Sequence, residues 1–281
     1  MALIVPEVFA DAVNAKLDTS LRIRRVAFDA TPDVAEVMQY GGTVRFPKLN
    51  RSVTAVEVTK GAPLTPDAVD MTDMSAPIKQ VAASVRVYDV EAAQIKGRVM
   101  DSMVVQVAEE MAKHIDKDLV VAIDTDAVYK QATAAANAIT ADELMAGIGC
   151  FGDNVDTASY AGIVINSRLF SSFAKMDTFT SIEKTYNKAE QANGIVVDGI
   201  IGYFMGIPVI MCDNGTYDET AKECKSYIVK REALGYVFQR NISIDEEREA
   251  KLLATDIIAH SLYAVKLLDT NGAVVLRKTV A

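Results

Sequence analysis

The chain has 281 residues, of which 50% are hydrophobic and 24% are charged, so it can bury a large core, and disorder is excluded as its dominant state. Its formal net charge is −9, from 29 basic and 38 acidic side chains, which argues against a protein that works mainly by neutralising nucleic-acid phosphates. No apolar run approaches the roughly 20 residues that cross a bilayer. Pro6, Glu7 and Asp11 interrupt the first residues without a basic leader, so we expect no secretory signal, no membrane contact and synthesis in the cytoplasm.

Residues 1–40 are predicted to form an arm that lies on another surface. They offer one short amphipathic segment, Val8 to Leu17, followed by a break at Thr31-Pro32-Asp33. A small basic cluster also lies here, with acidic residues around it: Arg22, Arg24 and Arg25, beside Asp18, Asp29 and Asp33. We expect these arginines to pair with acids of a neighbouring segment or chain instead of with DNA.

Residues 44–90 change to an extended pattern. Val44 and Phe46 alternate with polar residues, Val53 to Val58 is β-branched, and Val81 to Val87 alternates again. The stretch between Lys60 and Pro77 is irregular and rich in proline and acids. The pattern predicts a long two-stranded projection with too little apolar surface to stand alone in water.

At Asp89 the periodicity changes to that of a helix. Asp89 suits an N-cap, and apolar residues then recur every four positions: Ile95, Val99, Met103, Val107, Met111, Ile115 and Leu119. Charged residues hold the other side. This predicts a helix of about 33 residues, roughly 50 Å long, against which other elements pack.

The remaining sequence mixes short helices and strands, which favours an α+β fold. The expected elements are, in order, a weak segment Val128–Ala138, a capping box at Thr140 to Glu143 that opens a helix to Gly149, a buried strand Tyr160–Ile165, a helix from Asn166 or Ser167 to Phe173, a loop Met176–Gly194 and an extended run Ile195–Met205.

Turn residues divide the segment that follows. Gly206 permits a positive φ, Pro208 can open a strand, and Asn214-Gly215 favours a tight turn before a strand at Ser226–Lys230. Residues 236–277 are rich in strand patterns, and Asn271-Gly272 is predicted to be a hairpin turn into Ala273–Leu276.

The residues that usually carry catalysis are scarce. His114 is interpreted as a half-exposed helical side chain and His260 as a polar residue on a strand face, and no zinc, dinucleotide, P-loop or GxSxG motif is present. The acids at 67, 70 and 73 and the run Asp245, Glu246, Glu247 and Glu249 lack calcium-loop spacing, so they are interpreted as solvated or as paired between subunits. Cys150, Cys212 and Cys224 form no CxxC pair and are predicted to be reduced. We expect no catalytic, cofactor or metal site, and therefore no enzyme.

Four segments in this order resemble the major capsid proteins of tailed bacteriophages, whose fold encapsulins share: GGTVRFPKLN, IVINSRLFSSFAKMD, GYFMGIPVIMCDN and SYIVKREALGYVFQRNISIDEERE. The resemblance covers nearly the whole chain and includes the family's Gly-x-Pro-Val element at Gly206–Val209. It implies an N-terminal arm (1–40), an extended loop (41–88), a spine helix of about 89–122 with the first part of a peripheral domain (89–155), an axial domain (156–230) and a peripheral C-terminal sheet (231–281).

The resemblance also implies a function. Such a chain would be the major coat subunit of an icosahedral head, assembling into hexamers and pentamers around double-stranded DNA without sequence-specific binding. Scaffolding, portal and decoration proteins are the expected partners, and the virion is the expected location. The chain begins directly with the arm, so a separate scaffold or none is expected, and an isopeptide cross-link from Lys48 or Lys60 is not favoured. The alternatives are an encapsulin-like nanocompartment shell and an α/β metabolic enzyme with unrecognised chemistry.

Overall fold

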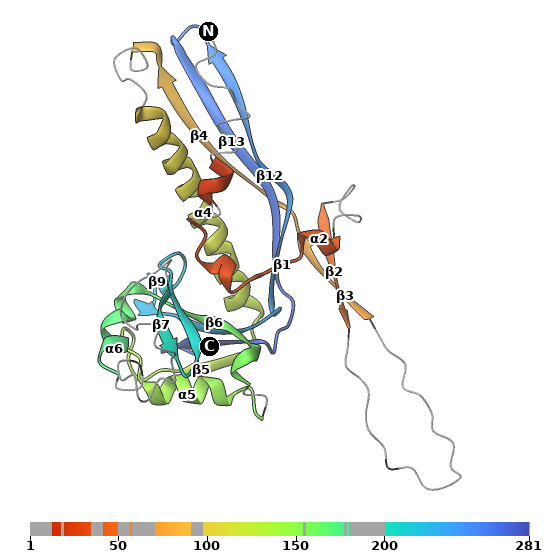
Figure 1. The fold of residues 1–281 in the computed structure, drawn as a ribbon, viewed down its shortest axis with the longest axis vertical. Helices are drawn as coiled ribbons and strands as arrows, with labels where there is room; N and C mark the ends of the chain where they lie inside the picture. Colours follow the sequence, from red (N-terminus) through yellow and green to blue (C-terminus); the bar gives the residue numbers. More distant parts are fainter. Residues whose placement is uncertain are drawn as a thin grey trace.

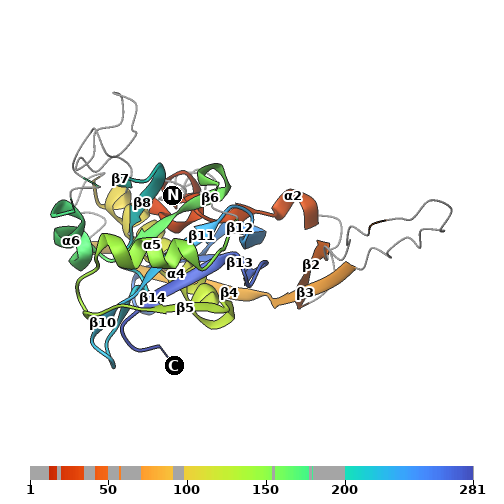
Figure 2. The same cartoon turned by 90° about the horizontal axis from the view of Figure 1, so that it is seen from below.

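The computed structural model describes residues 13–17, 20–34, 42–49, 57, 71–90, 98–153, 156–176, 179 and 200–280. A long sheet with a long helix along it rises from an α/β unit, and a two-stranded hairpin points away from both (Figure 1). The view from below shows the same hairpin projecting beyond the rest of the chain (Figure 2). None of the helices in these ranges is long and apolar enough to cross a membrane.

Helix α4 (Arg98–Asp126) is the predicted spine. Val107, Met111, Ile115 and Leu119 are buried, which confirms the apolar stripe where the side chains are described. The helix runs past the expected end at residue 122, because the apolar spacing continues through Ile123. Residues 91–97 lie outside the described ranges, so the start predicted at Asp89 stays a prediction.

The long sheet packs against α4. Its strands lie in the order β1 (Phe28–Asp29), β12 (Leu234–Glu249), β13 (Ala254–Leu267) and β4 (Lys79–Tyr88). The alternation predicted for β4 is confirmed, since Val81, Val85 and Val87 join the core that contains α4. However, β4 pairs with β13 over ten residue pairs, so it is not the return strand of the projection as the sequence suggested.

The projection is formed by β2 (Thr43–Leu49) and β3 (Met71–Pro77). Placing residues 71–77 in the irregular tip was therefore wrong. The sequence hides β3 because its stabilising contacts are tertiary: Ala76 packs with Val44 and Phe46 against Val237 and Ala264 of the long sheet. The predicted strand Val53–Val58 lies outside the described residues except for Glu57.

A second, six-stranded sheet organises the α/β unit. Its order is β5 (Tyr129–Ala132), β14 (Ala273–Arg277), β11 (Ser226–Lys230), β6 (Tyr160–Ile165), β8 (Ile207–Met211) and β7 (Ile200–Phe204). Helices α5 (Ala141–Gly149) and α6 (Phe170–Ala174) contribute to the core on one face, and α4 contributes to the core on the other. The capping box of Thr140 and Glu143 is confirmed at the start of α5.

One turn was misjudged. Asn271-Gly272 is not a hairpin turn, because β14 pairs with β11 and β5 and lies in a different sheet from β13. Residues 273–276 are buried, as expected for a strand covered on both faces. Strands β5 and β14 therefore share a sheet with residues 160–230, although the expected division placed them elsewhere.

The predicted backbone positions around β8 are confirmed. Met205 (φ 51°) and Gly206 (φ 83°) form the tight connection from β7 to β8, and Gly215 has φ 76°. Six further short elements are η1 (Ile23–Arg25), α2 (Thr31–Val34), η2 (Thr157–Ser159), η3 (Ser167–Leu169), β9 (Tyr217–Asp218) and β10 (Glu223–Cys224).

Candidate functional site

A buried carboxylate fastens the N-terminal segment, residues 20–30, to the spine helix. Asp116 of α4 is fully buried and accepts hydrogen bonds from the backbone N–H groups of Arg22 (3.3 Å) and Ile23 (3.2 Å). The Asn214 side-chain amide, from the turn after β8, donates to the same carboxylate at 3.3 Å. Burial raises the pKa of Asp116 to about 6, and these hydrogen bonds oppose the rise. Three parts of the chain therefore meet on one desolvated acid.

Asn14, β1 and Thr31, on either side of and within this segment, cover the edge of β12. The Asn14 amide binds both the N–H (3.2 Å) and the C=O (3.3 Å) of Ile242, as a neighbouring strand would. Near the start of β12, β1 pairs with this strand, and Thr31 Oγ1 accepts a hydrogen bond from the Phe238 N–H. These contacts satisfy part of a strand edge that would otherwise be free to pair with another chain.

The basic cluster is engaged within the chain. Arg24 donates to the Tyr236 hydroxyl at 2.6 Å and lies 3.8 Å from Asp29, and Arg22 donates to the Met211 carbonyl at 3.2 Å. A cavity of about 530 Å³ beside Arg22 is lined by charges of both signs, among them Lys113 and Asp213. Mixed charge of this kind does not favour a phosphate site.

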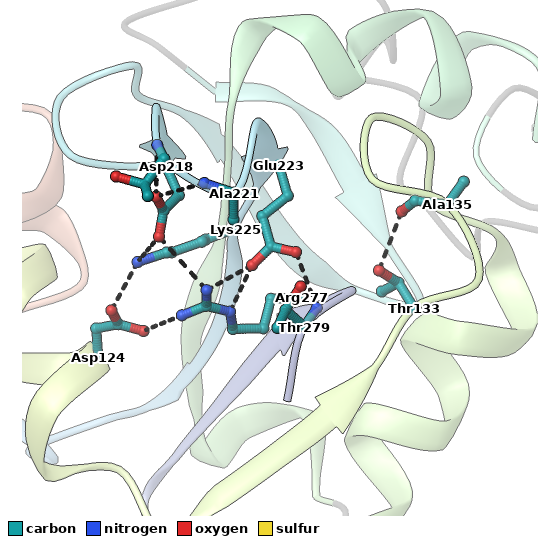
Figure 3. A network of polar contacts seen from close by, with 10 residues as sticks. Asp124, Thr133, Ala135, Asp218, Ala221, Glu223, Lys225, Arg277 and Thr279 are labelled. Carbon is teal, nitrogen blue, oxygen red and sulfur yellow. Dashed lines mark hydrogen bonds and ion pairs between the residues drawn. The ribbon is translucent and has the colours of Figure 1, made fainter. Parts of the chain in front are cut away.

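A network of five charged residues joins the end of α4 to the six-stranded sheet (Figure 3). Lys225 contacts Asp124 of α4 at 2.7 Å and Asp218 of β9 at 3.4 Å. Arg277 of β14 contacts the same two acids, at 3.9 and 3.4 Å, and also reaches Glu223 of β10. The network therefore joins α4, the β9–β10 pair and the six-stranded sheet.

Glu223 is the buried member of this network. It is 1% exposed, accepts from Arg277 Nε at 2.7 Å and accepts from the Thr279 N–H at 2.8 Å. Burial alone raises the pKa of Glu223, but the Thr279 N–H and the Arg277 guanidinium outweigh burial and hold the pKa below its usual range. The carboxylate is therefore ionised and depends on these two partners.

The far end of the long sheet carries bidentate ion pairs. Arg86 of β4 binds Asp256 of β13 through two contacts of 2.7 Å, and Arg248 of β12 binds Asp89. The carboxylate of Asp89, predicted to be an N-cap, is thus committed to Arg248. From the predicted acidic run, Glu249 lies 3.4 Å from Arg86, so part of this run pairs within the chain.

Both histidines have polar partners that the sequence did not indicate. His114 Nδ1 lies 3.1 Å from the Tyr263 hydroxyl, which donates to Asp118 at 2.7 Å. His260 lies between Ser243 (2.8 Å) and Asp245 (3.4 Å). No local motif predicts these groups, because the first depends on the packing of α4 against β13 and the second on the pairing of β12 with β13.

The cysteines and the acidic clusters were the remaining candidates from the sequence. All three cysteines are free; Cys212 and Cys224 are buried, and burial raises the pKa of the Cys212 thiol to about 12. The acids at 67 and 70 and Lys60 lie outside the described residues, so their roles stay predictions. Within the described ranges, no group of three or more His, Cys, Asp or Glu could hold a metal ion.

No family model matches the sequence, and no curated protein matches it significantly. Solved structures do match. A structure from Mycobacterium phage Che8 is 18% identical, with a TM-score of 0.65 over 89% of both chains. The capsid structure of the cyanophage P-SCSP1u is 16% identical, with a TM-score of 0.63 over 91% of this chain and 87% of that one. The virus-like particle from Pyrococcus furiosus is 13% identical, with a TM-score of 0.62 over 96% and 98%. The chain has the α+β major capsid fold of tailed phages, as its sequence suggested.

Proposed function

We propose that this chain is the major coat subunit of an icosahedral phage head. The observation that carries the proposal is the match of fold to phage capsid chains over about nine-tenths of the length on both sides. Copies would assemble into hexamers and pentamers, and these would close around double-stranded DNA.

The projection gives the proposal a physical basis. Among the described residues, β2 and β3 pair only with each other, so the outer edge of each strand offers backbone groups to a neighbour. A two-stranded ribbon is marginally stable in water, and the side chains described as packing on the long sheet, Val44, Phe46 and Ala76, lie near the base of this one. A neighbouring copy would supply the missing contacts.

The proposed domains are those expected from the sequence, except that the axial domain gains β5 and β14. Residues 1–40 would be the arm, 41–88 the extended loop with β4 anchored in the long sheet, and α4 the spine. Residues 156–230 would form the axial domain together with β5 and β14, which the six-stranded sheet includes. The long sheet and α4 would form the peripheral domain.

The charge balance suits a container. A wall with a net charge of −9 per subunit would hold phosphate weakly and leave enclosed DNA mobile. No cofactor enters this mechanism, and scaffolding, portal and decoration proteins would be the partners of the shell. The subunit would be made in the host cytoplasm and would end in the virion.

Assembly of the purified full chain tests the proposal. Sedimentation velocity and negative-stain microscopy should show capsomers or closed shells. A sharp monomer or small-oligomer peak across protein concentration and salt would contradict the proposal and revive the enzyme alternative. Particles from the natural host should contain nuclease-resistant double-stranded DNA; shells that instead carry a folded protein cargo would indicate a nanocompartment.

A further inference from the structure

Three side chains on one face of the long sheet form a serine, imidazole and carboxylate row. Ser243 Oγ lies 2.8 Å from His260 Nε2, and Asp245 Oδ2 lies 3.4 Å from Nδ1 of the same ring. The hydroxyl and the carboxylate therefore occupy opposite sides of one imidazole.

The strand register brings these residues together. Ser243 and Asp245 are two apart on β12 and so share a face, and Ser243 is the direct cross-strand partner of His260 on β13. The neighbours Ile244 and Ala259 are buried in the core that contains α4. The row thus lies on the sheet face that points away from α4. The imidazole is only 15% exposed, whereas Asp245 is 73% exposed.

We propose that Ser243 is an activated nucleophile and a site of covalent acyl modification. In the tautomer that carries its hydrogen on Nδ1, the nitrogen 3.4 Å from Asp245, Nε2 has the lone pair and accepts a hydrogen bond from the Ser243 hydroxyl. A serine hydroxyl beside an imidazole base that is itself oriented by a third group is the arrangement that makes this weak nucleophile reactive.

The reaction with an activated ester transfers the acyl group from the leaving oxygen to Ser243 Oγ. Ser243 Oγ attacks the ester carbonyl carbon while His260 Nε2 takes the hydroxyl proton. The tetrahedral adduct collapses, the bond to the leaving oxygen breaks, and a phenolate or alkoxide departs, taking the proton from the imidazolium where its basicity requires it. The product is an ester of Ser243, and no oxidant, reductant or further reactant is needed.

The setting indicates which reagents fit. Ala82 of β4 lies opposite His260 in the sheet, so the surface beside the ring carries a small side chain. Water screens the charge of the exposed Asp245, which limits its help to the imidazole. We therefore expect a serine that reacts once with small activated acyl donors, without rapid turnover.

Acetylation by p-nitrophenyl acetate tests the proposal on the full chain. The time course of p-nitrophenolate release is followed, and peptide mass spectrometry locates the acetyl groups. Ser84, on the same outward face of β4, is an internal control hydroxyl, because it pairs with Ile258 and not with a histidine. Ser243 should acetylate much faster than Ser84, and Ser243→Ala should abolish the fast phase.

The base is tested by two further variants with circular dichroism as the fold control. His260→Gln should slow acetylation of Ser243 about 100-fold, the scale of general-base catalysis. Asp245→Asn should cause a smaller loss. Equal labelling of Ser243 and Ser84, or labelling of His260→Gln at the wild-type rate, overturns the proposal. If His260→Gln does not fold, the comparison of Ser243 with Ser84 decides, and equal labelling of the two serines overturns the proposal.

Discussion

Asp116 should make the subunit less stable at neutral pH than at mildly acidic pH. Its pKa rises from the usual 3.8 to about 6 in the folded chain, chiefly through burial. A rise of this size corresponds to about 3 kcal/mol of differential interaction between the two protonation states. Between pH 3.8 and about 6, Asp116 is protonated in the folded chain and largely ionised in the unfolded chain. The free energy of unfolding therefore falls as pH rises through this range, and the full loss of about 3 kcal/mol is reached above pH 6.

The variant Asp116→Asn removes the titration while keeping the size of the side chain. It loses hydrogen bonds, because its amide nitrogen faces donors, and it should be less stable than wild type at pH 4. That deficit should shrink by about 2 kcal/mol on going to pH 7, since only the wild type buries a charge there. Urea unfolding of unassembled subunits at both pH values measures the two differences, and the other titrating groups cancel between the proteins.

The direction of the change is decisive. A deficit that stays constant would show that Asp116 titrates normally in the folded chain. A deficit that grows toward pH 7 would show that the N–H groups of Arg22 and Ile23 stabilise the carboxylate by more than burial destabilises it. Either result would refute the assignment of burial as the dominant effect.

Three other outcomes are expected. Val107→Asp places a charge in the buried stripe of α4 and should cost several kcal/mol in thermal unfolding, whereas Gln106→Asp, on the exposed side, should cost less than about 1 kcal/mol. Arg277→Met strands the buried Glu223 carboxylate and should destabilise the subunit by about 3 kcal/mol in urea, with much of the loss recovered when Glu223→Gln is added; additive losses would contradict the pairing. Replacing residues 50–70 by a short Asn-Gly turn between β2 and β3 should leave a cooperatively folded subunit by circular dichroism that no longer closes shells by sedimentation. Intact shells would contradict a role for residues 50–70 of the extended loop in holding neighbouring subunits together.

Local periodicity accounts for the elements that the sequence predicted well. The spacing of Val107, Met111, Ile115 and Leu119 follows a helix whatever surrounds it, and the capping box at Thr140 is complete within four residues. The strands at β6, β8 and β11 are dense apolar runs bounded by turn residues. These signals need no knowledge of distant parts of the chain.

Partnerships between strands were not predictable in the same way. Strand β3 has weak alternation and gains its place from Val237 and Ala264, more than 160 residues away. Asn271-Gly272 has hairpin chemistry, yet β14 leaves the sheet of β13 to fill a gap between β5 and β11. Asp116 and the row of Ser243, Asp245 and His260 depend on the same nonlocal choices, which one sequence does not reveal.

The connection between β3 and β4 has a mechanical consequence. Only Ile78 separates these strands, and its N–H donates to the Gly42 carbonyl at 3.0 Å, so residues 71–88 run almost without interruption from the projection into the long sheet. At about 3.3 Å per residue, residues 71–88 form a nearly continuous extended segment of about 60 Å. In the proposed shell, a force applied to the hairpin by a neighbouring subunit would pass through this short connection to β4, the strand that lies along α4. The projection and the spine helix should therefore tilt together as one lever when subunits move against each other.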